Sequence, residues 1–144
     1  MYVKDVMQTV VTTTPKGTPV QDAFEIMRDG GFRHLPVLDE FGKVAGILSD
    51  RDLRSVGAVY KDEATGSEDF LVTEDTTVDK IMATKPYSVS PEDSVSFAID
   101  IIKDKRIGCL IVSKGGELLG ILSYMDLLTA LKQILEKPAR ESAA

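Results

Sequence analysis

An internal repeat constrains the fold of this chain more than any other feature of its sequence. Val6-Met7 recurs as Ile81-Met82, and Thr14-Pro15 recurs as Ser90-Pro91, roughly 75 residues further on. Gly46-Ile47-Leu48-Ser49 recurs as Gly120-Ile121-Leu122-Ser123, and Asp52-Leu53 recurs as Asp126-Leu127. The number of residues between matching positions changes by one within a turn, whereas the apolar positions of the two repeats match. This pattern indicates a structural duplication.

Each repeat contains one amphipathic helix. Val20, Ala23, Phe24 and Met27 are spaced i, i+3, i+4, i+7, and Val95, Ala98, Ile99 and Ile102 repeat the spacing. This spacing places four apolar side chains on one helix face. Thr18 is predicted to cap the first helix, with Pro19 in its first turn.

A hairpin and a second helix follow. Residues 33–38 and 43–48 are short apolar segments separated by a turn that contains glycine, which predicts a β-hairpin. The next helix is expected from Ser49, and its counterpart in the second repeat extends to about Lys137. The predicted class is α/β (α+β): two strand-helix-hairpin-helix repeats, packed sheet to sheet with pseudo-two-fold symmetry. A unit of this size cannot bury both faces of its own sheet.

The repeats predict domain limits of 1–60 and 78–136, with a connection at 61–77 and a flexible tail at 137–144. Residues 61–79 contain seven acidic residues and one basic residue, which accounts for the whole net charge of −6. We expect this acidic connection to be a solvated, mobile loop. A regulatory or metal-binding loop is the alternative, but the spacing of a calcium loop is absent.

Composition excludes several classes. With 43% apolar and 28% charged residues, the chain has the balance of a soluble globular protein. It lacks an apolar run long enough for a membrane span, and its N-terminus lacks a secretory signal, so we expect a cytoplasmic location. A neutral body with an acidic connection argues against nucleic-acid binding. One cysteine and one histidine leave no disulfide framework or clustered metal site.

The motifs resemble those of a known family. Gly-Ile-Leu-Ser-Asp-Arg-Asp-Leu (46–53) and Gly-Ile-Leu-Ser-Tyr-Met-Asp-Leu (120–127) resemble the closing motif of the CBS domain. Val-Lys-Asp-Val-Met near the start and Arg-His-Leu-Pro-Val-Leu-Asp (33–39) resemble its opening and its central strand. Two such domains in tandem resemble a CBS pair, or Bateman module, of the acetoin-utilisation type. The resemblance implies a module that binds adenosine ligands such as AMP, ADP, ATP or S-adenosylmethionine in two clefts between the repeats.

The repeated Ser-x-x-Asp elements, Ser49/Asp52 and Ser123/Asp126, have two interpretations. A helix capping box is sufficient to explain either copy alone. The resemblance adds a second role, in which each aspartate accepts hydrogen bonds from the two ribose hydroxyls. The two roles are compatible, because serine can cap while aspartate binds.

The family geometry assigns the remaining residues to two clefts. In the first, Asp126 and Ser123 are expected to act with Arg33, His34, Thr12 and Thr13, where the basic pair approaches phosphate. In the second, Asp52, Ser49 and Arg51 are expected to act with Ser88, Ile107 and Gly108. Phe32, Ile47, Ile107 and Ile121 are predicted walls for adenine, although each is also a plausible core residue. We rank the Asp126 cleft first, since Gly108 and Cys109 offer no charge where the first repeat has Arg33 and His34.

Two classes of function remain open. The first is a nucleotide sensor that signals by a change of shape or of oligomeric state, with a protein partner yet to be identified. The alternative is a protein-interaction or dimerisation module with ligand-free clefts. An enzyme is not expected, because no nucleophile has a base partner and no Walker A or GxGxxG loop is present. The resemblance also implies a homodimer, built on helix faces expected to be open at Phe24/Met27, at Ile99/Ile102 or on the C-terminal helix.

Overall fold

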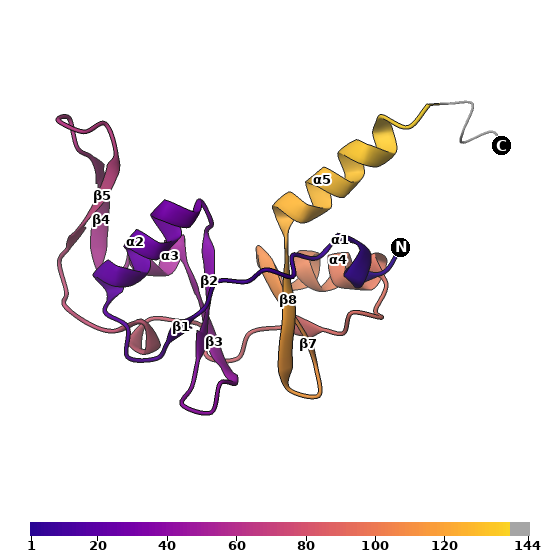
Figure 1. The fold of residues 1–144 in the computed structure, drawn as a ribbon, viewed down its shortest axis with the longest axis horizontal. Coiled ribbons are helices and arrows are strands. Elements are labelled where there is room, and N and C mark those ends of the chain that lie inside the picture. Colours follow the sequence, from indigo (N-terminus) through magenta and orange to yellow (C-terminus); the bar gives the residue numbers. More distant parts are fainter. Residues whose placement is uncertain (139–144) are drawn as a thin grey trace. The chain divides into compact units, whose positions relative to one another are not determined.

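The computed structural model describes residues 1–138, which form two compact units (Figure 1). The middle unit comprises Thr12–Pro86, and the terminal unit comprises Met1–Val11 together with residues 87–138. Of the predicted tail 137–144, residues 139–144 lie outside the described residues. Both units combine helices with small sheets, which is the predicted mixed class.

The middle unit has a three-stranded sheet in the order β1-β2-β3. Strand β1 (Thr14–Pro15) is parallel to β2 (His34–Leu38), and β2 is antiparallel to β3 (Val44–Ser49), so the predicted hairpin is confirmed. Helix α2 (Val20–Gly30) buries all four predicted apolar residues in a core shared with Leu35, Val37 and Leu48. Helix α3 (Asp50–Leu53) is short, and a 3-10 turn follows later at Val78–Lys80.

The terminal unit repeats this plan. Strand β6 (Ser88–Val89) is parallel to β7 (Cys109–Lys114), which is antiparallel to β8 (Glu117–Ser123). Helix α4 (Val95–Lys105) buries Ala98 and Ile102, whereas Ile99 is 36% exposed. Helix α5 (Tyr124–Leu135) is the long second helix, and helix α1 (Val3–Val6) packs near it.

The beginning of each sequence repeat folds with the other repeat's sheet. In the terminal unit, Gln8 forms an antiparallel bridge with Ile121, and in the middle unit Ala83 bridges Ile47. Both bridges need a glycine beside them, because a Cβ on Gly120 would lie 2.5 Å from the Gln8 carbonyl oxygen and one on Gly46 would lie 2.5 Å from that of Ala83. The recurring Gly-Ile-Leu-Ser motif therefore has a packing reason. The compact units also differ from the sequence repeats, since residues 1–11 join the terminal unit.

The acidic connection is not the loop that its charge predicted. Strands β4 (Gly57–Lys61) and β5 (Glu68–Val72) form an antiparallel hairpin across much of it. Phe70 is 4% exposed and stacks on Phe24 with ring centroids 5.2 Å apart. One buried aromatic residue within an otherwise solvated segment supplies the apolar contact that charge patterning misses.

Two smaller predictions are also wrong. Thr18 does not cap α2, because its hydroxyl donates to the Pro15 carbonyl oxygen and Pro19 takes the cap position. The helix face at Phe24 and Met27 is not open, because both residues are buried beneath or beside the hairpin.

Candidate functional site

The candidate site residues Ser49 and Asp52 of the middle unit lie where β3 ends and α3 begins. The Asp52 Oδ2 atom accepts a hydrogen bond from the Ser49 amide at 2.8 Å, and the Ser49 hydroxyl accepts one from the Asp52 amide at 3.2 Å. This is a reciprocal capping box. No hydrogen bond within residues 1–138 reaches the second carboxylate oxygen of Asp52. That oxygen remains able to accept a bond from another molecule.

His34 lies beside this capping box, because it is the register partner of Ser49 in the β2–β3 pair. Burial lowers the pKa of His34 from its usual 6.5, and the neighbouring carboxylates of Asp50 and Asp52 oppose that shift. The imidazole is therefore held toward its neutral form near pH 7.

Two arginines of the middle unit lie close in sequence to the elements that form this capping box. Arg33 precedes β2, and its carbonyl oxygen accepts from the Asp50 amide at 3.0 Å, while Arg51 lies within α3. Both side chains are exposed, and neither takes part in an ion pair among the described residues. The β3–α3 junction therefore has one carboxylate oxygen that can still accept a hydrogen bond, and the two arginines have guanidinium groups without an ion-pair partner among the described residues.

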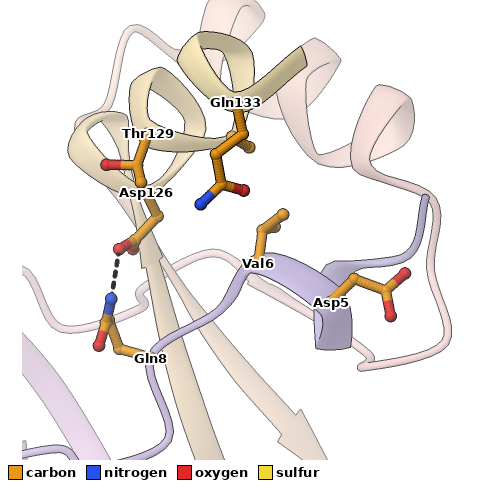
Figure 2. A pocket seen from close by; sticks show the side chains of 7 residues that line it. Asp5, Val6, Gln8, Asp126, Thr129 and Gln133 are labelled. Carbon is orange, nitrogen blue, oxygen red and sulfur yellow. Dashed lines mark hydrogen bonds between the residues drawn. The ribbon is translucent and has the colours of Figure 1, made fainter. Parts of the chain in front are cut away.

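The terminal unit holds its matching carboxylate differently. Asp126 is 8% exposed, and its Oδ2 atom accepts from the Ser123 amide at 2.8 Å and from the Ser123 hydroxyl at 3.2 Å. Its Oδ1 atom accepts from the Gln8 side-chain amide at 2.8 Å, as Figure 2 shows. Both oxygens of Asp126 are thus already engaged within the unit.

Gln8 is a site residue that sequence reasoning missed. Its equivalent in the other repeat is Ala83, which has no polar side chain. In the sequence, the one indication of its role is that the first repeat has a side-chain amide where the second repeat has a small apolar residue. This difference does not predict a contact with Asp126, because the two residues meet only through the bridge between Gln8 and Ile121.

A pocket of about 140 Å³ adjoins this carboxylate between α1 and α5 (Figure 2). Its lining is mostly polar: Asp5, Val6, Gln8, Asp126, Thr129, Ala130 and Gln133. The Asp5 carboxylate also accepts from the Tyr2 amide at 2.7 Å. The pocket is small compared with sites for drug-sized molecules, which enclose about 300–1,000 Å³.

The β3–α3 junction of the middle unit and the β8–α5 junction of the terminal unit differ strongly in charge. Cys109 is the register partner of Ser123, as His34 is of Ser49, and Gly108 and Met125 stand where the other unit has Arg33 and Arg51. Burial raises the pKa of the Cys109 thiol, and the Asp126 carboxylate raises it further. The thiol is therefore a small buried group without thiolate reactivity.

The structure divides the predicted site residues between the units. The middle unit holds Thr12, Thr13, Phe32, Arg33, His34, Ile47, Ser49, Arg51 and Asp52, and the terminal unit holds Ser88, Ile107, Gly108, Ile121, Ser123 and Asp126. Within each unit the serine and aspartate meet as expected. Phe32 packs against the core of the middle unit, and Ile107 packs against that of the terminal unit. The combination of residues from both units in each cleft stays a prediction.

The sequence matches the family model of the CBS domain twice. The matches cover residues 3–58 and residues 78–133, which together make up most of the chain. The chain belongs to the CBS-domain family.

Solved structures show the same fold. An acetoin utilization protein (AcuB) from Vibrio cholerae is 27% identical, with a TM-score of 0.76 over 94% of this chain and 95% of that one. CBSX2, solved in complex with AMP, is 23% identical, with a TM-score of 0.76 over 94% and 98%. The CBS domain pair of MJ0100, solved with 5'-methylthioadenosine and S-adenosyl-L-methionine, is 19% identical, with a TM-score of 0.76 over 93% and 98%. The last two likenesses concern the fold alone.

A curated relative places the same module in a longer protein. The uncharacterized protein MJ1404 of Methanocaldococcus jannaschii is 31% identical over 112 residues, which is 77% of this chain but 24% of the relative. The chain thus spans about a quarter of that protein's length.

No helix within residues 1–138 is both long and apolar enough to cross a bilayer. Across the same residues, no three His, Cys, Asp or Glu side chains gather in a group that could hold a metal ion.

Proposed function

We propose that this CBS pair is a regulatory module that binds an adenine nucleotide, AMP, ADP or ATP, between its repeats. Binding changes the shape or the oligomeric state of the module, and a partner protein responds to that change. The module carries no catalytic group in this proposal, and it works in the cytoplasm as a homodimer.

The main support is the repeated carboxylate. Asp52 and Asp126 occupy equivalent positions, each held by a serine at the end of a Gly-Ile-Leu-Ser strand. A fixed carboxylate is a strong acceptor for a ribose diol, because charge-assisted hydrogen bonds are about twice as strong as neutral ones. The AMP complex of CBSX2, a protein with the same fold, is consistent with such a ligand.

Charge supports a phosphorylated ligand. Arg33 and Arg51 are exposed cations without an ion-pair partner among the described residues. In the proposed first cleft, Arg33 and His34 approach the phosphate while Asp126 and Ser123 hold the ribose, and Thr12 and Thr13 complete the polar lining. In the second, Arg51 approaches the phosphate and Asp52 and Ser49 hold the ribose, beside Ser88 and Gly108. The adenine lies against Phe32, Ile47, Ile107 and Ile121.

One observation favours the alternative of a ligand-free interaction module. Both Asp126 oxygens are satisfied by Gln8 and Ser123, so the terminal unit needs no ligand to compensate its buried carboxylate. For nucleotide to bind there, the ribose hydroxyls must share or replace the Gln8 amide.

A thermal-shift panel of AMP, ADP, ATP, S-adenosylmethionine, NAD and adenosine tests the proposal. A ligand at a hundred times its dissociation constant stabilises the folded state by about 2.7 kcal/mol. We expect stabilisation by at least one adenine nucleotide and its loss in the Asp52→Ala/Asp126→Ala double variant. If no member of the panel stabilises the wild-type protein, the interaction module is the better explanation.

A further inference from the structure

Strands β4 and β5 form a two-stranded sheet, so each strand has one edge that the other strand does not cover. Their pairing is regular from Gly57↔Val72 to Lys61↔Glu68, without a bulge. The hairpin lies beside α2 in the middle unit (Figure 1). Unpaired backbone groups along such an edge can hydrogen-bond to a strand of another molecule. Whether an edge is available depends on what its own chain already places there.

The hydrogen bonds at the two ends of the hairpin show which backbone groups point outward. The Asp62 amide donates to the Ser67 carbonyl oxygen at 2.8 Å, and the Thr73 amide donates to the Val56 carbonyl oxygen at 2.8 Å. In an antiparallel ladder, opposed residues alternate between bonded and non-bonded pairs, and the backbone groups of a non-bonded pair point away from each other. The alternation, followed inward from either end, gives the same three non-bonded pairs: Gly57/Val72, Val59/Phe70 and Lys61/Glu68.

The outer edge of β5 is already occupied. The Glu68 carbonyl oxygen accepts from the Arg28 guanidinium of α2 at 3.2 Å, and the Phe70 amide donates to Oδ1 of its neighbour Asp69 at 2.8 Å. The Phe70 ring stacks on Phe24 of the same helix. The middle unit itself therefore covers this edge.

The outer edge of β4 is open. Within residues 1–138, the backbone groups of Gly57, Val59 and Lys61 take part in no hydrogen bond outside the β4–β5 ladder. Every residue of β4 after Gly57 is exposed. Proteins usually protect such an edge with proline, a bulge or several lysines. Strand β4 has neither proline nor a bulge, and its one lysine is its last residue.

Acidic side chains stand beyond both ends of β4. Asp62 and Glu63 follow the strand directly. Glu74 and Asp75 lie at the other end, because the Glu74 amide donates to the carbonyl oxygen of Val56, next to the start of β4, at 3.2 Å. None of these four carboxylates takes part in an ion pair among the described residues. Two copies of β4 would bring acidic ends together in parallel and in antiparallel pairing alike, and such like-charge contacts are destabilising.

We propose that an extended, lysine- or arginine-rich segment of a partner protein adds to the open edge of β4 as a third strand. Backbone hydrogen bonds to Gly57, Val59 and Lys61 hold the segment, in the manner of other strand additions to a sheet edge. Basic residues at both ends of the segment, separated by the length of β4, meet Glu63 and Glu74, which gives the contact its selectivity. The proposal rests on the proposed function for the existence of a partner protein, and it names the chemical class of the segment that this partner presents.

NMR titration of the whole isotope-labelled chain tests the edge with a defined probe. The probe is the acetylated and amidated peptide Lys-Lys-Thr-Val-Thr-Val-Thr-Lys-Lys, and its counterpart has glutamate in place of every lysine. We expect the lysine peptide to cause saturable shifts of the Gly57, Val59 and Lys61 amides that weaken as salt is raised, and the glutamate peptide to cause none. Absence of these shifts at millimolar lysine peptide would overturn the proposal. Shifts of the same amides with protein concentration alone would mean that β4 pairs with a second copy instead.

A matched pair of charge variants separates a local contact from net charge. Glu63→Gln/Glu74→Gln removes one carboxylate at each end of β4, whereas Asp100→Asn/Asp104→Asn removes two exposed carboxylates of α4 in the other unit. The first variant should weaken binding of the lysine peptide by about twofold to thirtyfold, the range for two exposed ion pairs. The second should leave it unchanged. Equal weakening would show that only the overall charge of the chain attracts the peptide.

A backbone variant tests strand pairing itself. Val59→Pro removes the outward amide at the middle of β4, and proline is tolerated at an edge position whose amide faces away from the ladder. Val59→Thr keeps the amide and is the control. We expect binding of the lysine peptide to be lost in Val59→Pro and kept in Val59→Thr, with the same circular dichroism spectrum for both.

The same test can be made on the peptide if Val59→Pro disturbs the hairpin. Methylation of the backbone nitrogens of both valines in the lysine peptide keeps its charges but prevents strand pairing, so this peptide should not bind the wild-type chain. Unchanged binding of the methylated peptide would contradict strand addition. AMP titrations on the same samples separate the two proposals, since peptide binding without nucleotide binding contradicts only the nucleotide site, and nucleotide binding without peptide binding contradicts only the assignment of β4.

Discussion

The side-chain amide of Gln8 donates a 2.8 Å hydrogen bond to Oδ1 of Asp126, although 118 residues separate them in the chain. This bond occupies the carboxylate oxygen that faces away from the capping contacts with Ser123. The equivalent carboxylate, Asp52, has no such partner because Ala83 stands at the equivalent position. Gln8 is therefore a direct competitor for any ribose that binds Asp126.

Removal of the Gln8 side-chain amide should strengthen nucleotide binding at Asp126. In Gln8→Ala the Asp126 oxygen is freed, so we expect tighter binding of AMP or ATP by isothermal titration calorimetry. Thr9→Ala, at the neighbouring exposed position, is the control and should leave affinity unchanged. A Gln8→Ala variant that binds nucleotide less tightly would instead make the Gln8 amide a ligand contact.

The two carboxylates should contribute unequally. We predict that Asp126→Ala weakens adenosine-ligand binding more than Asp52→Ala does, because Arg33 and His34 are assigned to its cleft. Loss of a charge-assisted acceptor costs about 1.5–3 kcal/mol. Calorimetry on both variants measures the difference, and urea titrations of the same variants show how much stability each loses with its capping box. Equal affinity in wild type and Asp126→Ala would remove Asp126 from the site.

Arg33 should discriminate by ligand charge. The guanidinium stays protonated throughout the working pH range, so Arg33→Ala should weaken AMP or ATP while leaving adenosine nearly unchanged. S-adenosylmethionine, which is cationic at sulfur, should be disfavoured in the wild-type cleft. The matched variant Arg54→Ala removes another exposed arginine close in sequence and should change neither affinity. If Arg33→Ala affects AMP and adenosine alike, the basic pair does not contact phosphate.

His34 should respond to pH in a defined direction. Because burial holds its pKa below 6.5, the unfolded chain binds this proton more readily than the folded protein does. The stability that neutral His34 contributes is complete above pH 6.5 and is lost as the pH falls from 6.5 toward the folded pKa. NMR titration of the imidazole should show this lowered pKa, and bound AMP should raise it if the phosphate lies nearby. His34→Asn should remove this part of the pH dependence, and an apo pKa above 6.5 would contradict the burial effect.

The hairpin should stabilise the middle unit through one residue. Phe70 is buried on Phe24, and replacement of a buried phenylalanine by alanine costs about 3–5 kcal/mol. We expect Phe70→Ala to lower the free energy of unfolding by about that amount in urea titrations. The neighbouring Leu71→Ala, at a 60% exposed position, should change it by less than about 0.5 kcal/mol. Similar small losses in both variants would mean that the hairpin is not part of the core.

Much of the fold follows from local periodicity. Val20, Ala23, Phe24 and Met27 were identified as one buried helix face, and the hairpin segments were placed within one or two residues of β2 and β3. The serine–aspartate pairs were also predictable, because a capping box is a contact between residues three apart. Such contacts depend on the spacing of neighbouring residues, which the sequence displays directly.

The remaining features depend on contacts between distant segments. Gln8 reaches Asp126 only because the start of the first repeat bridges the second repeat's strand, and Phe70 reaches Phe24 only because the acidic segment folds back over α2. The duplication, the helix faces and the carboxylate positions can all be predicted from the order and spacing of residues along the chain. Which carboxylate already has a partner, and which helix face is covered, depends on side chains that packing brings together from distant segments, so neither could be predicted from spacing.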